Sequence, residues 1–126
     1  MTYFADLSDY SYLRGEPSML NVGWLGGEHD FPLGDVDPST LRKLLILADE
    51  PANMMRGWHA CEFCDAEPPV VVDAPVPEGR IWLGSGEIHV RGSTGDVYAA
   101  PTLVVHYIAV HRYRPPTAFL DAVMST

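Results

Sequence analysis

The sequence predicts an α+β fold, in which a small antiparallel sheet that includes a hairpin packs with two main helices. Three patterns carry this prediction. An apolar face repeats at helical spacing between residues 38 and 50, two short runs flank a turn at 92–96, and a second apolar stripe follows residue 101. With 126 residues, 47% of them hydrophobic, we expect one domain that spans 1–126.

Residues 1–36 are rich in aromatic and acidic side chains and contain one basic residue, Arg14. Within them, Leu20–Leu25 is expected to form a strand that ends at Gly26-Gly27, and 28–35 is expected to be a loop because it contains proline and glycine. The aromatic side chains either pack into the core or form a surface for a partner protein. They are Tyr3, Phe4, Tyr10, Tyr12, Trp24 and Phe31.

Asp37-Pro38 marks the start of the first main helix. Asp37 can cap the free N–H groups, and proline fits the first helical position. The helix is expected to end before Pro51, because proline cannot continue it. Its apolar face repeats at i, i+3, i+4 and i+7, and consists of Leu41, Leu44, Leu45 and Ala48.

The middle of the chain is expected to consist of loops and short strands. Residues 52–64 form an irregular loop, and 65–79 form a proline-rich linker with a short edge strand at 70–72. A further strand is expected at 81–83.

A β-hairpin is expected at 87–99, where 87–91 and 97–99 flank the turn at 92–96. Alternation along the first strand places Glu87 and His89 on its polar face.

The second main helix is expected to begin at Pro101, with His106 in its middle and His111 near its end. Pro115-Pro116 then breaks the chain before a short final helix. The apolar stripe of the second helix consists of Leu103, Val104, Ile108 and Ala109, and that of the final helix of Phe119, Leu120 and Val123.

Cys61 and Cys64 are the two cysteines of the chain, spaced C-x2-C. Two thiols at this spacing can bind one metal ion, and imidazoles can complete a tetrahedron. We therefore predict a Zn²⁺ ion held by Cys61, Cys64, His106 and His111. This ion would join the loop segment around Cys61 and Cys64, here called the cysteine knuckle, to the second helix. The order of knuckle, hairpin and helical histidines is zinc finger-like, although 41 residues separate Cys64 from His106, more than in a small finger.

His59 is an alternative ligand, because His59, Cys61 and Cys64 place three donors within six residues. If it binds, one of the helical histidines is free. His89, on the polar face of a strand, and His29, in a glycine-rich loop, are expected to be solvated.

A structural zinc has four protein ligands, whereas a catalytic zinc keeps one position for water. Five available donors favour the structural site. If only three bind, water could occupy the fourth position, with Glu62 or Glu87 as the base. A zinc deaminase has H-x-E before its C-x2-C motif, whereas here the cysteines come first and Glu87-Ile88-His89 follows, so that enzyme class is disfavoured. A thioredoxin-like C-x2-C lies in a βαβ unit, whereas a proline-rich segment follows Cys64 here.

The chain is acidic, with a net charge of −9 and eight basic residues, of which only Lys43 is a lysine. Phosphate backbones and anionic lipids attract clustered basic residues, so nucleic acid and membrane are disfavoured as partners. An acidic surface instead suits solubility, a basic protein or a cationic ligand. Neither a secretory signal nor a membrane-spanning run is visible, so we expect a soluble, cytoplasmic protein. Because the cytosol is reducing, a C-x2-C pair there is typical of metal ligands or a redox pair rather than of a structural disulfide.

Several blocks of residues together resemble an uncharacterised family of small bacterial proteins that is common in actinobacteria. The resemblance covers nearly the whole chain and implies an intact domain in a bacterial cytoplasm, without implying a reaction. The blocks are Tyr3–Ser8 with Tyr10 and Tyr12, Leu20–Leu25, Arg56–Cys64, Tyr98–Pro101, His106-Tyr107, His111 and Tyr113–Pro116.

These features favour a structural Cys/His zinc site in a protein that binds another protein, in an accessory or regulatory role. A small zinc-dependent hydrolase is the alternative. An immunity-type inhibitor of a toxin is a further alternative, which the acidity and small size would fit.

Overall fold

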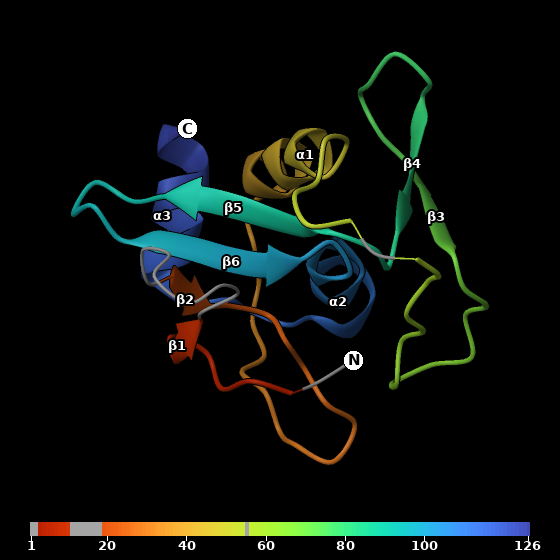
Figure 1. The fold of residues 1–126 in the computed structure, drawn as a ribbon, viewed down its shortest axis with the longest axis horizontal. Coiled ribbons are helices and arrows are strands. Elements are labelled where there is room, and N and C mark those ends of the chain that lie inside the picture. Colours follow the sequence, from red (N-terminus) through yellow and green to blue (C-terminus); the bar gives the residue numbers. More distant parts are fainter. Residues whose placement is uncertain (1–2, 11–18, 55) are drawn as a thin grey trace.

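A computed structural model describes residues 3–10, 19–54 and 56–126 of the chain. Figure 1 shows that these residues form helices and two small sheets, which confirms the α+β fold. Tyr12, predicted to pack into the core or to form a partner surface, lies outside the described residues. So does Arg14, the one basic residue of 1–36. Within the described part of the chain, none of the helices combines the length and hydrophobicity needed to cross a membrane.

The larger sheet has four strands in the order β1 (Asp9–Tyr10), β2 (Met19–Asn21), β6 (Val97–Pro101) and β5 (Glu87–Arg91). β5 and β6 form the expected antiparallel hairpin, and β1 pairs with β2 in the same way. The sheet is nevertheless mixed rather than purely antiparallel, because β2 lies parallel to β6. The hairpin leaves the outer edge of β6 free, and β2 fills that edge with a strand from much earlier in the chain.

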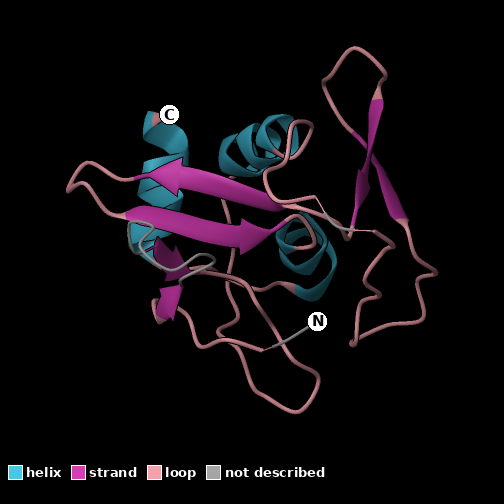
Figure 2. Cartoon of the chain, viewed as in Figure 1, coloured by secondary structure: helices cyan, strands magenta, loops and turns pink. Residues whose placement is uncertain are grey.

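The smaller sheet is an antiparallel ribbon of β3 (Val70–Asp73) and β4 (Arg80–Leu83). It stands to one side of the larger sheet in Figure 1. The proline-rich segment at 65–79 is therefore less a linker than one arm of this ribbon with its turn. Figure 2 shows the long irregular connection between α1 and β3, which carries both cysteines.

The helices are α1 (Pro38–Leu47), α2 (Val104–His111) and α3 (Thr117–Ser125). α1 begins as predicted, since the Asp37 carboxylate accepts a hydrogen bond from the Ser39 N–H at 3.1 Å. The start of α2 differs from the prediction. Pro101 ends β6, opposite Glu87, and the helix begins three residues later.

The main core lies between the sheet and the helices. α1 packs against both α2 and α3, and α3 packs against β5. Ile88 and Val90 of β5 point into this core, so the predicted alternation along that strand is confirmed. The most deeply buried side chains of the core include Val22, Leu44, Leu83, Leu103, Val104, Tyr107, Tyr113, Phe119 and Val123.

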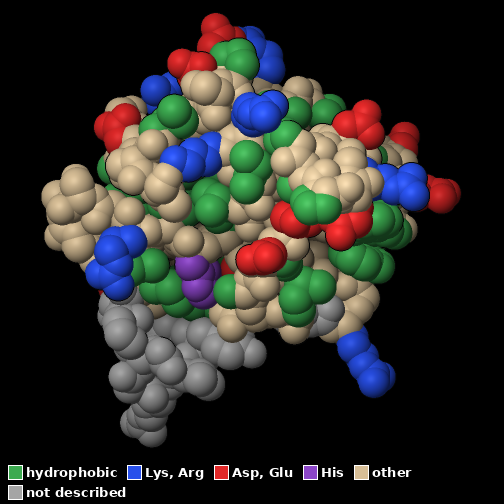
Figure 3. All heavy atoms as spheres, turned by 90° about the horizontal axis from the view of Figure 1, so that it is seen from above, with side chains coloured by type: hydrophobic (Ala, Val, Ile, Leu, Met, Phe, Trp, Pro, Cys, Tyr) green, Lys and Arg blue, Asp and Glu red, His purple; other side chains and the backbone are tan. Residues whose placement is uncertain are grey.

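A second, smaller apolar cluster consists of Tyr10, Trp24 and Ala99. Tyr10 and Trp24 are buried, so these two N-terminal aromatics serve packing rather than form a free surface. Tyr3 and Phe4 are more than one-third exposed, and Phe4 meets Trp24 edge to face. The space-filling view in Figure 3 shows basic side chains scattered among acidic and hydrophobic ones, without a continuous basic patch on that face.

Candidate metal centre

The cysteine knuckle is fastened to the fold by bonds ahead of the first thiol and by bonds between the two thiols. Ahead of it, the His59 N–H donates to the Gly84 carbonyl at 2.9 Å. Within it, the Phe63 N–H points at the Cys61 sulfur at 3.4 Å, and the Glu62 carboxylate accepts from the Gly27 N–H at 3.0 Å. The two thiols are therefore held on a loop whose backbone is already anchored.

The end of α2 brings the two helical histidines together. An offset of five residues would place them well apart around a regular helix. His111 is the last residue of α2, because Arg112 takes a left-handed conformation with φ 58° and caps the helix by donating to the Tyr107 carbonyl. The rings of His106 and His111 lie 5.1 Å apart between centroids, at 75° to each other.

Cys61, Cys64, His106 and His111 form one cluster, as the sequence predicted. One ligand atom from each lies within 4.8 Å of those of the other three. The Cys61 sulfur is 3.4 Å from Nε2 of His111, and the Cys64 sulfur is 3.4 Å from Nε2 of His106. Sulfur and nitrogen ligands of one tetrahedral zinc lie about 3.5 Å apart. The cluster therefore has the spacing of a four-coordinate metal site.

The protonation of His106 suits a metal site, whereas Cys61 must lose a proton to bind a metal. Burial lowers the pKa of His106, and the neighbouring His111 lowers it further, which favours the neutral imidazole that binds metals. Burial raises the pKa of the Cys61 thiol. A metal ion would therefore displace a proton from Cys61 as it binds.

Phe63 covers the cluster from the knuckle side. Its ring packs edge-on against Phe31 and Tyr107, with centroids 5.1 and 5.9 Å away, and lies 5.8 Å from the ring of His111. These aromatic contacts fix the loop against α2.

A family model for a domain of unknown function, DUF7919, matches residues 2–124, which is nearly the whole chain. The chain belongs to this family. No curated protein and no solved structure matches it.

The remaining histidines of this DUF7919 chain lie apart from the cluster. His59 is not among the grouped ligand atoms of the described residues and lines a separate cavity with Glu87. The prediction that His89 is solvated is corrected, because it is partly buried and its Nε2 lies 2.8 Å from the Glu87 carboxylate. His29 is exposed and stacks on Tyr3.

Neither carboxylate considered as a catalytic base belongs to the metal cluster of the DUF7919 chain. Across the described residues, the grouped ligand atoms come from cysteine and histidine only. Glu62 binds the backbone of Gly27, and Glu87 is engaged by Tyr10, Asn53 and His89.

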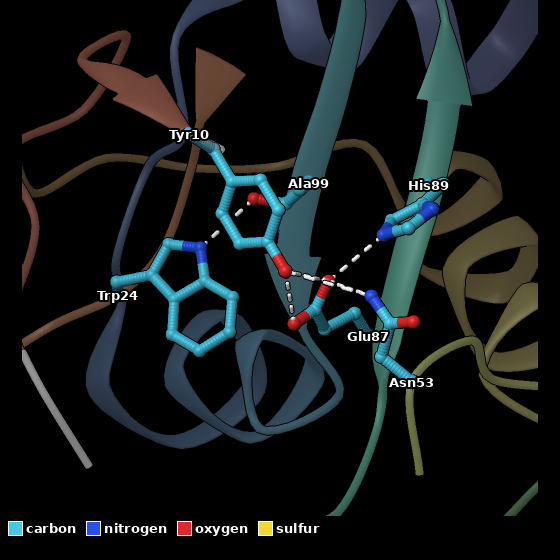
Figure 4. A network of polar contacts seen from close by, with 6 residues as sticks. All are labelled: Tyr10, Trp24, Asn53, Glu87, His89 and Ala99. Atoms are coloured by element: carbon cyan, nitrogen blue, oxygen red, sulfur yellow. Dashed lines mark hydrogen bonds and ion pairs between the residues drawn. The ribbon is translucent and has the colours of Figure 1, made fainter. Parts of the chain in front are cut away.

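Sequence reasoning missed this polar network around Glu87. Figure 4 shows its carboxylate between Tyr10 and Trp24 on one side and Asn53 and His89 on the other. The pairing of Glu87 with His89 two positions on was the available signal, since both lie on the same face of β5. The burial of Glu87 arises from Tyr10 and Asn53, which are distant in sequence.

Proposed function

We propose that the cluster binds a structural Zn²⁺ ion, which fastens the 57–64 loop to α2. The observation that supports this is the gathering of two thiols and two imidazoles within 4.8 Å of one another. Thiolate and imidazole ligands in a tetrahedral arrangement favour zinc among the common metals. Four protein ligands complete the coordination of such an ion, so the site is structural rather than catalytic.

The zinc-stabilised domain then serves to bind another protein. A hollow of about 170 Å³ lies between the end of α1 and β4. Trp58 and Trp82 line it and are 41% and 42% exposed, and Met54 beside them is 59% exposed. Exposed aromatic and methionine side chains around a hollow are typical of protein interaction sites. Because the chain carries a net charge of −9, the partner segment is apolar with flanking basic residues.

The hydrolase alternative has less support, because it needs an open metal position beside a free carboxylate. The immunity-type inhibitor stays a prediction that rests on acidity and small size.

Metal analysis of the purified protein tests the zinc proposal. We expect one zinc per chain, with X-ray absorption that reports two sulfur and two nitrogen ligands. The Cys61→Ser variant should lose most of the metal, whereas the His59→Gln variant should keep it. Metal-free wild-type protein purified with zinc present, or loss of zinc in His59→Gln, would contradict the ligand assignment.

Comparative capture from the native host tests the binding role. The Trp82→Ala variant should lose a partner that wild-type protein retains, and the Leu33→Ala variant, which alters another exposed apolar side chain, should keep it. A partner that all three proteins capture equally would exclude the tryptophan hollow as the contact surface.

A further inference from the structure

A small cavity lies beside the Glu87 network, separate from the metal ligands. It has a volume of about 30 Å³, and its lining includes Trp24, Asn53, His59 and Glu87. The side chain of Glu87 is only 10% exposed. A water molecule needs roughly 10–15 Å³ measured in this way, so the cavity accommodates one or two groups of that size.

The two oxygens of the Glu87 carboxylate differ in their partners. Oε1 lies 2.8 Å from Nε2 of His89, accepts from the Asn53 amide at 3.2 Å, and is 3.0 Å from the Tyr10 hydroxyl. Oε2 has one donor among the described residues, the same Tyr10 hydroxyl at 2.9 Å. That hydroxyl has a single proton to share between both oxygens. Oε2 therefore keeps capacity to accept hydrogen bonds.

The negative charge of Glu87 also has no permanent counter-ion among the described residues, since a histidine balances it only when protonated. Among the described residues, His89 is its one ion-pair partner, and no lysine or arginine pairs with it. A buried carboxylate is costly unless it is paired and hydrogen-bonded. A cationic ligand in the cavity would supply both the missing charge and the missing donors.

Trp24 adds a second feature that attracts cations. Its indole N–H donates to the Ala99 carbonyl at 2.9 Å, and its ring stacks with Tyr10 at 6.3 Å between centroids. These contacts hold the ring in place where it lines the cavity. Of the aromatic side chains, tryptophan attracts cations most strongly.

We propose that this cavity binds a primary ammonium group, carried either by a small amine or by a lysine side chain of a partner. The volume suits an ammonium, which is close to water in size, and is too small for a quaternary ammonium group. The inference does not depend on zinc, because the cavity and the metal cluster share no side chain.

Nuclear magnetic resonance of the full-length, ¹⁵N-labelled protein tests the proposal, because the chain has three tryptophans. Butylammonium chloride is added at constant ionic strength, with 1-butanol as the neutral probe and tetramethylammonium as the oversized cation. We expect a saturable shift of the Trp24 indole signal with butylammonium, while those of Trp58 and Trp82 stay in place. The other two probes should bind at least about tenfold more weakly.

Substitution of the carboxylate provides the second arm. Glu87→Gln keeps the shape of the side chain and removes its charge, so butylammonium affinity should fall about tenfold to a hundredfold. Glu67→Gln, at an exposed glutamate outside the cavity and the metal cluster, is the matched control and should retain wild-type affinity. If Glu87→Gln does not fold, the comparison of butylammonium with butanol in wild-type protein decides the question.

A lysine tripeptide with blocked ends identifies the source of the amine. Binding at least as tight as that of butylammonium assigns a partner's lysine, and binding of butylammonium alone assigns a small amine. No saturable Trp24 shift with either probe, or equal affinity for butanol, would overturn the proposal and leave a cavity filled by water. Because the cavity and the metal cluster share no side chain, the Trp24 shift should persist in zinc-stripped protein, and failure of the metal proposal would leave the amine site standing.

Discussion

Removal of the metal should lower the melting temperature of this protein, and the size of the fall depends on the length of chain between the metal ligands. The proposed zinc connects Cys61 and Cys64, in an irregular loop, to His106 and His111 on α2. Without the ion, the aromatic contacts of Phe63 and the backbone bonds of the knuckle remain to hold the loop. We therefore expect a folded but weakened protein, in which the 57–64 segment is the first to open.

The magnitude follows from the length of chain that the metal closes. Cys64 and His106 are 42 positions apart. A cross-link over a loop of this length destabilises the unfolded chain by about 4 kcal/mol in the relation used for disulfides. With an unfolding entropy of about 2.1 cal/mol/K per residue, 126 residues convert this into a fall in Tm of about 15 °C.

Calorimetry on zinc-loaded and chelator-stripped protein measures this difference, with metal content determined on the same samples. The Cys61→Ser variant should melt near the stripped protein, and His59→Gln should melt near the loaded one. A stripped protein, shown to be free of metal, that melts within about 3 °C of the loaded protein would refute the cross-linking role.

Three further outcomes follow from individual residues. Leu44→Ala, at a fully buried position of α1, should lower the free energy of unfolding by about 2–5 kcal/mol in urea titrations while zinc content stays unchanged. Gly84→Ala should destabilise by at least about 1–3 kcal/mol, because φ at this glycine is 112° and a Cβ would lie 2.8 Å from the His59 carbonyl oxygen; wild-type urea stability would contradict this. Hydrogen bonds from the Ser39 N–H and hydroxyl lower the pKa of Asp37. The contribution of this carboxylate to stability should therefore be present above pH 3.8 and be lost as the pH falls through the lower folded-state pKa, so Tm should fall more steeply in acid for wild type than for Asp37→Asn.

The elements that the sequence predicted well are those with local causes. α1 has its cap at Asp37 and its apolar repeat within one stretch, and the β5–β6 hairpin has its turn between its strands. The cysteine pair and the helical histidines were predicted on chemistry, since few residue types bind zinc. Their meeting needed a last helical turn that brings His111 close to His106, and a cysteine loop that is anchored at Gly84 and Gly27.

The features that escaped prediction depend on contacts between distant segments. Nothing near Leu20 indicates that its partner is Tyr98 in a parallel pair. The exclusion of His59 from the cluster follows from its backbone bond to Gly84, which depends on where β4 ends. Glu87 was correctly placed on the polar face of β5, but its burial requires Tyr10, 77 positions earlier.

The addition of the earliest strands to the far edge of the β5–β6 hairpin sets an order of events during synthesis. Tyr10 cannot meet Glu87 until 77 more residues have been made. At about 5–20 residues per second, that interval is about 4–15 s. Tyr113 extends it further, because its hydroxyl binds Asp6 across 107 positions. Strands β1 and β2 therefore leave the ribosome well before β6, the strand that joins them to the hairpin, and the four-stranded sheet is completed only late in translation.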